Sequence, residues 1–363
     1  MREAQSLEAT PSRAGQSVEA VRTCSPQRKR ADERDVRAGG RWTRPQALKN
    51  ASIRALVMAA LMVIDLMPAR HLIRCCALLG LLAHAVCARL RVHAMTQVAL
   101  ALPEADPRAT VRLSFRTAGT NLGLCLLLRR PSMIPSTVVS FAVEARHVLD
   151  TAVAEGRGCV VLSPHLGPYE YTAAVLAQLN YTPAVVVRES YDPKLNRTVD
   201  YHRRARGIEV IHRGRPEAPF ALLRALRRRR PVGFLPDLPG RTAAVSVQVL
   251  GCETRYALGP ERVARRTGAA VVMAWLEPVG QNHTCVRSTR PTFQLRMQRL
   301  QTGREEGSLL QRAADIASRA IRSSPEQCPW MGMNFHVFSP QGKRTLAGVR
   351  ELIGECESSR VSS

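Results

Sequence analysis

The spacing of apolar and polar residues changes several times along the chain. Residues 1–50 hold few large apolar side chains, and two apolar segments follow at 55–67 and 71–90. Residues 91–155 show apolar positions at helical spacing, interrupted by two pairs of prolines. From residue 156 onward, short apolar runs alternate with amphipathic stretches, as strands and helices do in α/β proteins. The sequence therefore predicts an α/β fold with a mixed sheet flanked by helices, preceded by a hydrophobic helical segment.

The individual elements can be predicted from the same pattern. The expected strands are the short apolar runs "CVVLS" (159–163), "AVVV" (184–187), "IEVI" (208–211), "VGFL" (232–235), "VSVQVL" (245–250) and "AVVMAWLEPV" (270–279). The expected helices are "YEYTAAVLAQLN", "DPKLNRTVDYHRRAR", "APFALLRALRRRR", "LGPERVARRTG" and, near the end, "SLLQRAADIASRAIRSS" (308–324). A polar tail over 341–363 follows the last of them.

Residues 1–90 differ from the rest in charge and hydropathy. Residues 1–50 carry eleven basic and six acidic side chains and are expected to form a disordered basic arm rather than a secretory signal. Residues 51–90 are expected to be membrane-anchoring or interfacial helices, although Pro68 splits them and neither half is a clean run of about 20 apolar residues. A hydrophobic helical pair packed on the core is the alternative. The arginine-rich flanks suit an anionic membrane surface and favour attachment.

The overall charge limits the kinds of partner. The 363 residues carry a net charge of +24, and 45% of them are hydrophobic. A field of this sign attracts anionic membranes, phosphates and acidic proteins. Aromatic residues make up only 4% of the chain, which leaves few stacking platforms for bases, so nucleic acid is not an expected partner.

The cysteines and glycines indicate no cofactor. The ten cysteines include no Cys-x-x-Cys pair, and Cys159 lies within an apolar run, where a buried thiol is expected. The chain has no HExxH pattern, and "GRGCVV" lacks the third glycine of a dinucleotide-binding loop. Neither a metal nor a redox cofactor is expected.

A candidate acid/base centre lies in "CVVLSPHLGPYEYTAAVLAQL" (159–179). His165 follows a predicted strand, and Glu170 lies in the first turn of the helix that Pro168 introduces. A carboxylate that accepts the imidazole N–H fixes the tautomer and makes the other nitrogen a general base for a hydroxyl. The alternative is a pair of polar residues closing a turn. A second pair with this spacing, His212 and Glu217, lies among arginines and is interrupted by proline, so it is not favoured.

This segment and several later ones resemble one enzyme family. "SPHLGPYE" resembles the His-x-x-x-x-acid motif of the lysophospholipid acyltransferase superfamily, and the later motifs resemble its lipid A late-acyltransferase branch. These motifs, in order, are "VVRESYDPKLNRTVDYHRRARGIEVI", "RRPVGFLPDLPG", "VSVQVLGCETRYALGPERVARRTGAAVVMA" and a final set of Pro325, Glu326, Gln327, Trp330 and Phe335. The resemblance runs from about residue 90 to 336, which implies an acyltransferase domain over 91–340.

The resemblance implies an O-acyltransferase that moves a fatty acyl chain from an acyl carrier protein or acyl-CoA thioester to a hydroxyl of a lipid A-type or other anionic glycolipid. It implies His165 as general base, Glu170 as the residue that orients it, and Arg188 and Asp237 as substrate-binding residues. It also implies a location on the cytoplasmic face of a bacterial inner membrane. The segment "MGMN" after Trp330 has no positive charge where the family has a basic cluster, so the acceptor lipid stays open.

Two other functions compete with this interpretation. One is a glycerolipid or lysophospholipid acyltransferase of the same superfamily, although those enzymes usually have Asn before the histidine and Asp at the end of the motif. The other is a non-catalytic basic adaptor for membranes or nucleic acid that has kept the fold. Replacing His165 separates an enzyme from an adaptor.

Overall fold

The computed structural model of the chain describes residues 42–189, 192–238, 242–280, 292–303 and 305–335. The first four helices are α2 (Arg44–Leu66), α3 (Ala69–Val86), α4 (Ala88–Ala101) and α5 (Pro107–Leu127). The remaining helices are α6 (Val143–Ala154), α7 (Glu170–Gln178), α8 (Pro193–Ala205), α9 (Ala218–Arg227), α10 (Gly259–Thr267) and α11 (Ser308–Ser323). Short 3-10 turns lie at Pro135–Thr137, Pro325–Gln327 and Trp330–Gly332.

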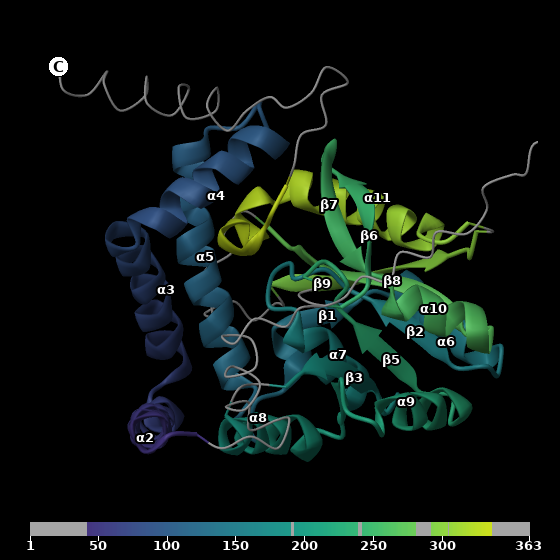
Figure 1. Cartoon of the computed structure of the whole chain (residues 1–363), viewed down its shortest axis with the longest axis horizontal. Coiled ribbons are helices and arrows are strands. Elements are labelled where there is room, and N and C mark those ends of the chain that lie inside the picture. Colours follow the sequence, from purple (N-terminus) through teal and green to yellow (C-terminus); the bar gives the residue numbers. More distant parts are fainter. Residues whose placement is uncertain (1–41, 190–191, 239–241, 281–291, 304, 336–363) are drawn as a thin grey trace, which may run out of the picture. The chain divides into compact units, whose positions relative to one another are not determined.

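Seven strands form the central sheet (Figure 1). Its spatial order is β1 (Val139–Phe141), β9 (Phe293–Leu300), β8 (Ala270–Pro278), β2 (Cys159–Leu162), β5 (Pro231–Phe234), β3 (Ala184–Arg188) and β4 (Glu209–Arg213). All neighbours pair in parallel except β8 and β9, which are antiparallel. A separate hairpin joins β6 (Ala244–Val249) to β7 (Cys252–Ala257). The predicted α/β fold with a mixed sheet flanked by helices is confirmed.

The central strand β2 shows why the sheet is covered on both faces. Its four residues are all buried, as expected for a strand of a parallel sheet with helices on each side. Val160 and Leu162 pack into a core with residues of α4, α9 and α11, while Cys159 and Val161 pack into a second core with residues of α3, α6 and α7. Alternation along one strand therefore supplies both hydrophobic cores.

The six predicted strands are present, and three more were missed. Two of the missed strands, β7 and β9, alternate apolar with charged or polar residues, as in "FQLRMQRL". This period-two pattern is typical of a strand with one exposed face, and a search for continuous apolar runs overlooks it. β1 has only three residues, which is too short for any pattern.

Helix α3 is packed tightly along α5. A Cβ atom added at Gly80 would lie 2.2 Å from the Phe115 carbonyl oxygen, and one added at Gly119 would lie 2.1 Å from the Cys76 carbonyl oxygen. The two backbones approach closely because glycine stands at both crossing points. Figure 1 shows the two helices side by side.

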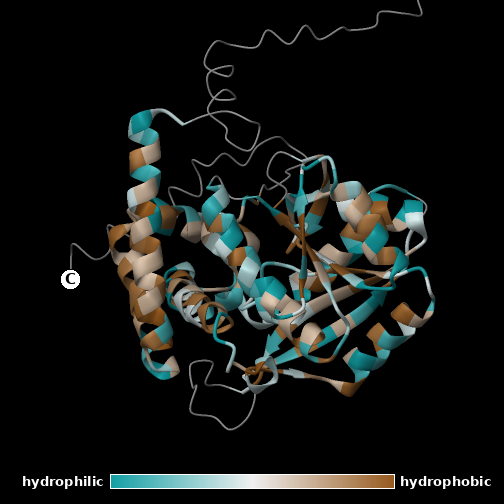
Figure 2. Cartoon of the chain, turned by 90° about the horizontal axis from the view of Figure 1, so that it is seen from below, coloured by the Kyte–Doolittle hydropathy of each residue, from teal (hydrophilic) through white to brown (hydrophobic). Residues whose placement is uncertain are grey.

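Helices α2 and α3 are both long and apolar enough to cross a membrane, judged by length and composition alone. No residue of α2 is buried, whereas α3 buries Leu72, Ile73 and Cys76. The outward face of α3 exposes Leu78, Leu79, Leu82 and Val86, and Figure 2 marks such hydrophobic residues in brown. The predicted hydrophobic helical segment is thus present, and one face of α3 belongs to the core.

The predicted domain boundaries only partly coincide with element boundaries. Helix α2 begins at Arg44, inside the expected basic arm of residues 1–50, and α4 continues across the expected boundary at residue 90. Residues 1–41 and the polar tail over 341–363 lie outside the described residues, so the expected disorder of the arm stays a prediction.

Candidate active site

Four adjacent strands, β2, β5, β3 and β4, end at the same edge of the sheet, because they are parallel. The loop after β2 carries His165, and the loop after β5 carries Asp237. Arg188 is the last residue of β3, and Arg213 is the last residue of β4. The carboxyl edge of an α/β sheet is where such proteins place ligands and reacting groups.

His165 and Asp237 form a hydrogen-bonded pair at this edge. The last residues of β2 and β5, Leu162 and Phe234, are register partners, and each functional residue stands three positions beyond its strand. His165 Nδ1 lies 2.7 Å from Asp237 Oδ1, and the His165 backbone N–H donates to Oδ2 over 2.7 Å. The carboxylate, whose side chain is only 3% exposed, therefore holds His165 by its ring and by its backbone and places a proton on Nδ1.

The other ring nitrogen of His165 is left for substrate. The imidazole lines a cavity of about 420 Å³ at the sheet edge, and among the described residues none bonds to Nε2. Tyr169 packs edge-on against the ring, with centroids 4.9 Å apart. Burial, and then the Glu170 charge, raise the pKa of Tyr169 to about 12, so its hydroxyl is neutral near physiological pH. A fixed Nδ1–H and an open Nε2 suit a general base.

Glu170 forms no hydrogen bond with the imidazole, although the sequence predicted one. Its carboxylate accepts hydrogen bonds from Arg203 on α8, from Nη2 over 2.6 Å and from Nε over 3.2 Å. The predicted hydrogen bond between Glu170 and His165 was wrong, because Asp237 already occupies Nδ1. Glu170 nevertheless lines the same cavity as His165.

Arg188 and Asp237 were predicted to bind substrate, and the structure places them differently. Arg188 lines the cavity together with His165 and is exposed. Asp237 lies behind His165 and uses both carboxylate oxygens to hold it. His165 and Asp237 are 72 residues apart in the sequence, which explains why a local motif could not reveal their hydrogen bond.

Sequence reasoning missed a second pair at the cavity. His212 Nε2 lies 2.7 Å from Asp200 Oδ2, so the acid partner of His212 comes from α8 and not from Glu217. His212 Nδ1 is buried and has no hydrogen-bond partner among the described residues. Asp200 stands between Val199 and Tyr201 on a strongly amphipathic helix, 12 residues before His212, so no local motif marked it in the sequence.

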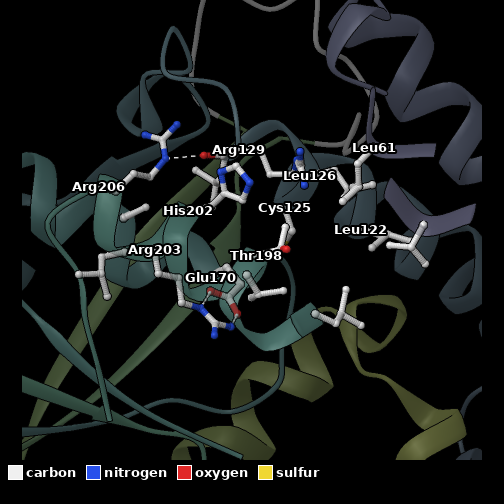
Figure 3. A pocket seen from close by; sticks show the side chains of 16 residues that line it. Leu61, Leu122, Cys125, Leu126, Arg129, Glu170, Thr198, His202, Arg203 and Arg206 are labelled. Carbon is white, nitrogen blue, oxygen red and sulfur yellow. Dashed lines mark hydrogen bonds and ion pairs between the residues drawn. The ribbon is translucent and has the colours of Figure 1, made fainter. Parts of the chain in front are cut away.

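An apolar pocket of about 270 Å³ adjoins the polar cavity and shares Glu170, Leu195, Val199 and Arg203 with it. Figure 3 shows Glu170 and Arg203 facing one another at this pocket, with Leu61, Leu122 and Leu126 among the apolar residues around it. Burial raises the pKa of the Cys125 thiol in its wall to about 12, so this thiol stays protonated and is a poor nucleophile.

No metal site is found in the part of the chain that the structure describes, where no three His, Cys, Asp or Glu side chains cluster suitably. Cys159 is buried, as expected, and burial raises its pKa to about 12. The polar side chains that line the cavity include acid/base groups and arginines.

Comparison with known proteins identifies relatives and a family. A segment of the chain is 34% identical over 136 residues to the phosphatidylinositol mannoside acyltransferase of Mycolicibacterium smegmatis, covering 36% of this chain and 44% of that protein. The phosphatidylinositol mannoside acyltransferase of Mycobacterium tuberculosis is 33% identical over 137 residues, covering 36% of this chain and 43% of the relative. The chain therefore matches less than half the length of these relatives. Residues 43–336 match the family described as bacterial lipid A biosynthesis acyltransferase, and the chain belongs to that family.

Proposed function

We propose that the protein is an O-acyltransferase that moves a fatty acyl chain from a thioester to a hydroxyl of an anionic glycolipid. The observation that carries the proposal is the His165–Asp237 pair, whose separation is 2.7 Å and whose histidine opens on a cavity. Membership of an acyltransferase family supports the reaction class.

In the proposed reaction, His165 Nε2 takes the proton of the acceptor hydroxyl as its oxygen attacks the thioester carbonyl carbon. The C–S bond then breaks, and the imidazolium returns the proton to the departing sulfur. The products are an ester and a free thiol, and no acyl-enzyme is formed. Asp237 keeps Nδ1 protonated and stabilises the imidazolium, a role that the sequence had assigned to Glu170.

The polar cavity and the apolar pocket suit different parts of the two substrates. The apolar pocket, with leucines from α2 and α5, suits the acyl chain, and the polar cavity suits the headgroup that carries the hydroxyl. Glu170 and Arg203 stand where the two join, and their ion pair keeps the wall rigid and gives Glu170 a positioning role.

The acceptor we propose is a glycolipid that carries a phosphate. Arg188 at the cavity edge presents a guanidinium that suits phosphate oxygens. The relatives named phosphatidylinositol mannoside acyltransferases support a phosphorylated glycolipid over a simple glycerol phosphate. The donor is an acyl carrier protein or acyl-CoA, which the basic surface would attract.

We place the protein on the cytoplasmic face of a bacterial inner membrane. The exposed apolar residues of α2 and α3 support attachment to a bilayer, since patches of this kind rarely stay in water. The arginine-rich composition supports binding to anionic lipid.

The test uses purified full-length protein with palmitoyl-CoA or with acyl carrier protein that carries a palmitoyl thioester. The acceptors are lipid A precursors, phosphatidylinositol mannoside, lysophospholipids and glycerol phosphate. Free thiol released only with one acceptor, together with an acylated product, supports the proposal and names the lipid. Thiol release that needs no acceptor indicates a thioesterase and contradicts it.

The same panel separates the alternatives. Preference for a lysophospholipid or glycerol phosphate would favour the glycerolipid acyltransferase. Full activity of His165→Ala would remove the proposed mechanism. A non-catalytic adaptor predicts no turnover with any acceptor and unchanged membrane binding in His165→Ala.

A further inference from the structure

Two arginines stand side by side at the edge of the cavity. Arg188 and Arg213 are register partners at the ends of the parallel strands β3 and β4. Partners of this kind lie on neighbouring strands about 4.8 Å apart and point to the same face of the sheet. Both residues line the cavity that His165 lines.

The acidic residues near these arginines are already paired with other groups. Glu170 is bonded to Arg203, and Asp200 is bonded to His212. The remaining carboxylate at this edge, Asp237, holds His165.

Glu189, which follows Arg188 in the chain, is bonded to Arg215. Within the described residues, no carboxylate forms an ion pair with Arg188 or Arg213. In the part of the chain that the structure describes, the cavity therefore contains two arginines that no carboxylate neutralises through an ion pair.

Without a bound anion, the two neighbouring arginines are electrostatically unfavourable. Arg213 is half-buried, and burial followed by the charge of Arg188 lowers its pKa. Both effects disfavour the charged guanidinium, and an anion held between the two side chains would reverse both. A guanidinium presents its donors in a planar fork that matches phosphate oxygens.

We propose that Arg188 and Arg213 together form a phosphate-binding site that positions a phosphate ester of the substrate while its reacting group lies at His165. This proposal rests on the proposed function, which assigned one arginine alone to the acceptor. The phosphate belongs either to the headgroup of the acceptor lipid or to the phosphopantetheine part of the donor, and both present the same chemistry.

The first experiment measures binding without turnover. Full-length His165→Ala protein is titrated by calorimetry with two matched pairs of probes: 4′-phosphopantetheine against pantetheine, and short-chain phosphatidic acid against the corresponding diacylglycerol. We expect Arg213→Gln, added to this background, to weaken binding of a phosphate-bearing probe by about 10- to 100-fold. Binding of its phosphate-free twin should not change. Arg188→Gln should have the same effect, and Arg213→Lys a smaller one, because lysine keeps the charge without the fork.

The control is Arg227→Gln, which removes an exposed arginine of α9 that does not line the cavity. Loss confined to 4′-phosphopantetheine identifies the donor phosphate, and loss confined to phosphatidic acid identifies the acceptor phosphate. Either result supports the site. Equal losses for both members of a pair, or losses no greater than those of Arg227→Gln, overturn it.

A kinetic series separates this site from the proposed function. With palmitoyl-CoA against palmitoyl-pantetheine, the Arg213→Gln enzyme should show a raised KM for palmitoyl-CoA alone if the site holds the donor phosphate. If the site holds the acceptor phosphate, the KM of the phosphate-bearing acceptor should rise instead. Failure of the wild-type protein to acylate any acceptor contradicts the proposed function, whereas the binding series still decides whether the arginines hold a phosphate.

Discussion

The two histidine–aspartate pairs at the sheet edge have equal separations and opposite orientations. His165 bonds to Asp237 through Nδ1, and His212 bonds to Asp200 through Nε2, each over 2.7 Å. The free nitrogen of His165 belongs to a side chain that is 23% exposed, whereas the free nitrogen of His212 is buried and finds no partner within the described ranges. An equal distance therefore does not give equal chemistry. The nitrogen that the carboxylate leaves open decides whether a histidine is able to act as a base.

The largest expected difference between the pairs is in turnover. His165→Ala removes the proposed base and should lower kcat/KM by about 10²- to 10⁴-fold. His212→Ala leaves Nε2 of His165 in place and should lower it by less than about tenfold. Acceptor-dependent thiol release measures both variants. Equal losses would contradict the assignment of roles.

The aspartates should differ in the same direction. In Asp237→Asn, the side-chain oxygen stays with the His165 backbone N–H, so the amide nitrogen faces Nδ1 and drives the proton to Nε2. With its proton on Nε2, His165 cannot accept the proton of the hydroxyl, and kcat should fall by about 10²- to 10⁴-fold.

Asp200→Asn is the matched control, because Nδ1 of His212 is buried and cannot reach a substrate hydroxyl, and its loss should stay within about tenfold. The pH profile of kcat/KM is measured for each variant and shows whether activity remains at other pH values. An Asp237→Asn enzyme with normal kcat would show that the pair does not set the tautomer.

For the free energy of unfolding, the order of the two pairs should be reversed, with the larger loss at His212. His212→Ala leaves the Asp200 carboxylate, in a residue only 8% exposed, without its hydrogen-bond partner. We expect the free energy of unfolding to fall by about 1–3 kcal/mol. His165→Ala keeps the backbone N–H bond to Asp237 and should lose less. Urea denaturation measures both, and a greater loss in His165→Ala would contradict this order.

The smallest expected effect concerns Tyr169, which packs against His165. Tyr169→Phe keeps the ring, so kcat/KM should change by less than about tenfold. The folded-state pKa of about 12 lies above the ordinary value of 10.0, so the unfolded chain ionises first. Wild-type stability should fall as the pH rises between these two values, and Tyr169→Phe should lose less. Parallel losses in urea denaturation at increasing pH would show that Tyr169 is not the group involved.

The sequence predicted the fold and the position of His165 well, for a local reason. Runs such as "CVVLS" followed by "PHLGP" define a strand and a corner within a few residues, and parallel strands bring such corners to one edge. Six strands and the helices between them followed from the same pattern. Strands with one polar face, such as β9, were missed because their apolar residues alternate.

The partners within the site could not be predicted, because they depend on packing between distant segments. Asp237 and His165 meet only when β2 and β5 pair, and Asp200 meets His212 only when α8 packs near β4. Glu170 has the right sequence spacing, but Arg203 holds its carboxylate. A motif names residues that share a cavity, and the register of the sheet decides which of them bond.

The glycine crossings between α3 and α5 have a mechanical consequence. Because Gly80 and Gly119 bring the two backbones into contact, a movement of α3 would carry α5 with it. A bilayer that took up the leucine face of α3 would therefore set the tilt of α5 as well. Leu122 and Cys125 of α5 form part of the apolar pocket wall, so a change in that tilt would alter the width of the pocket.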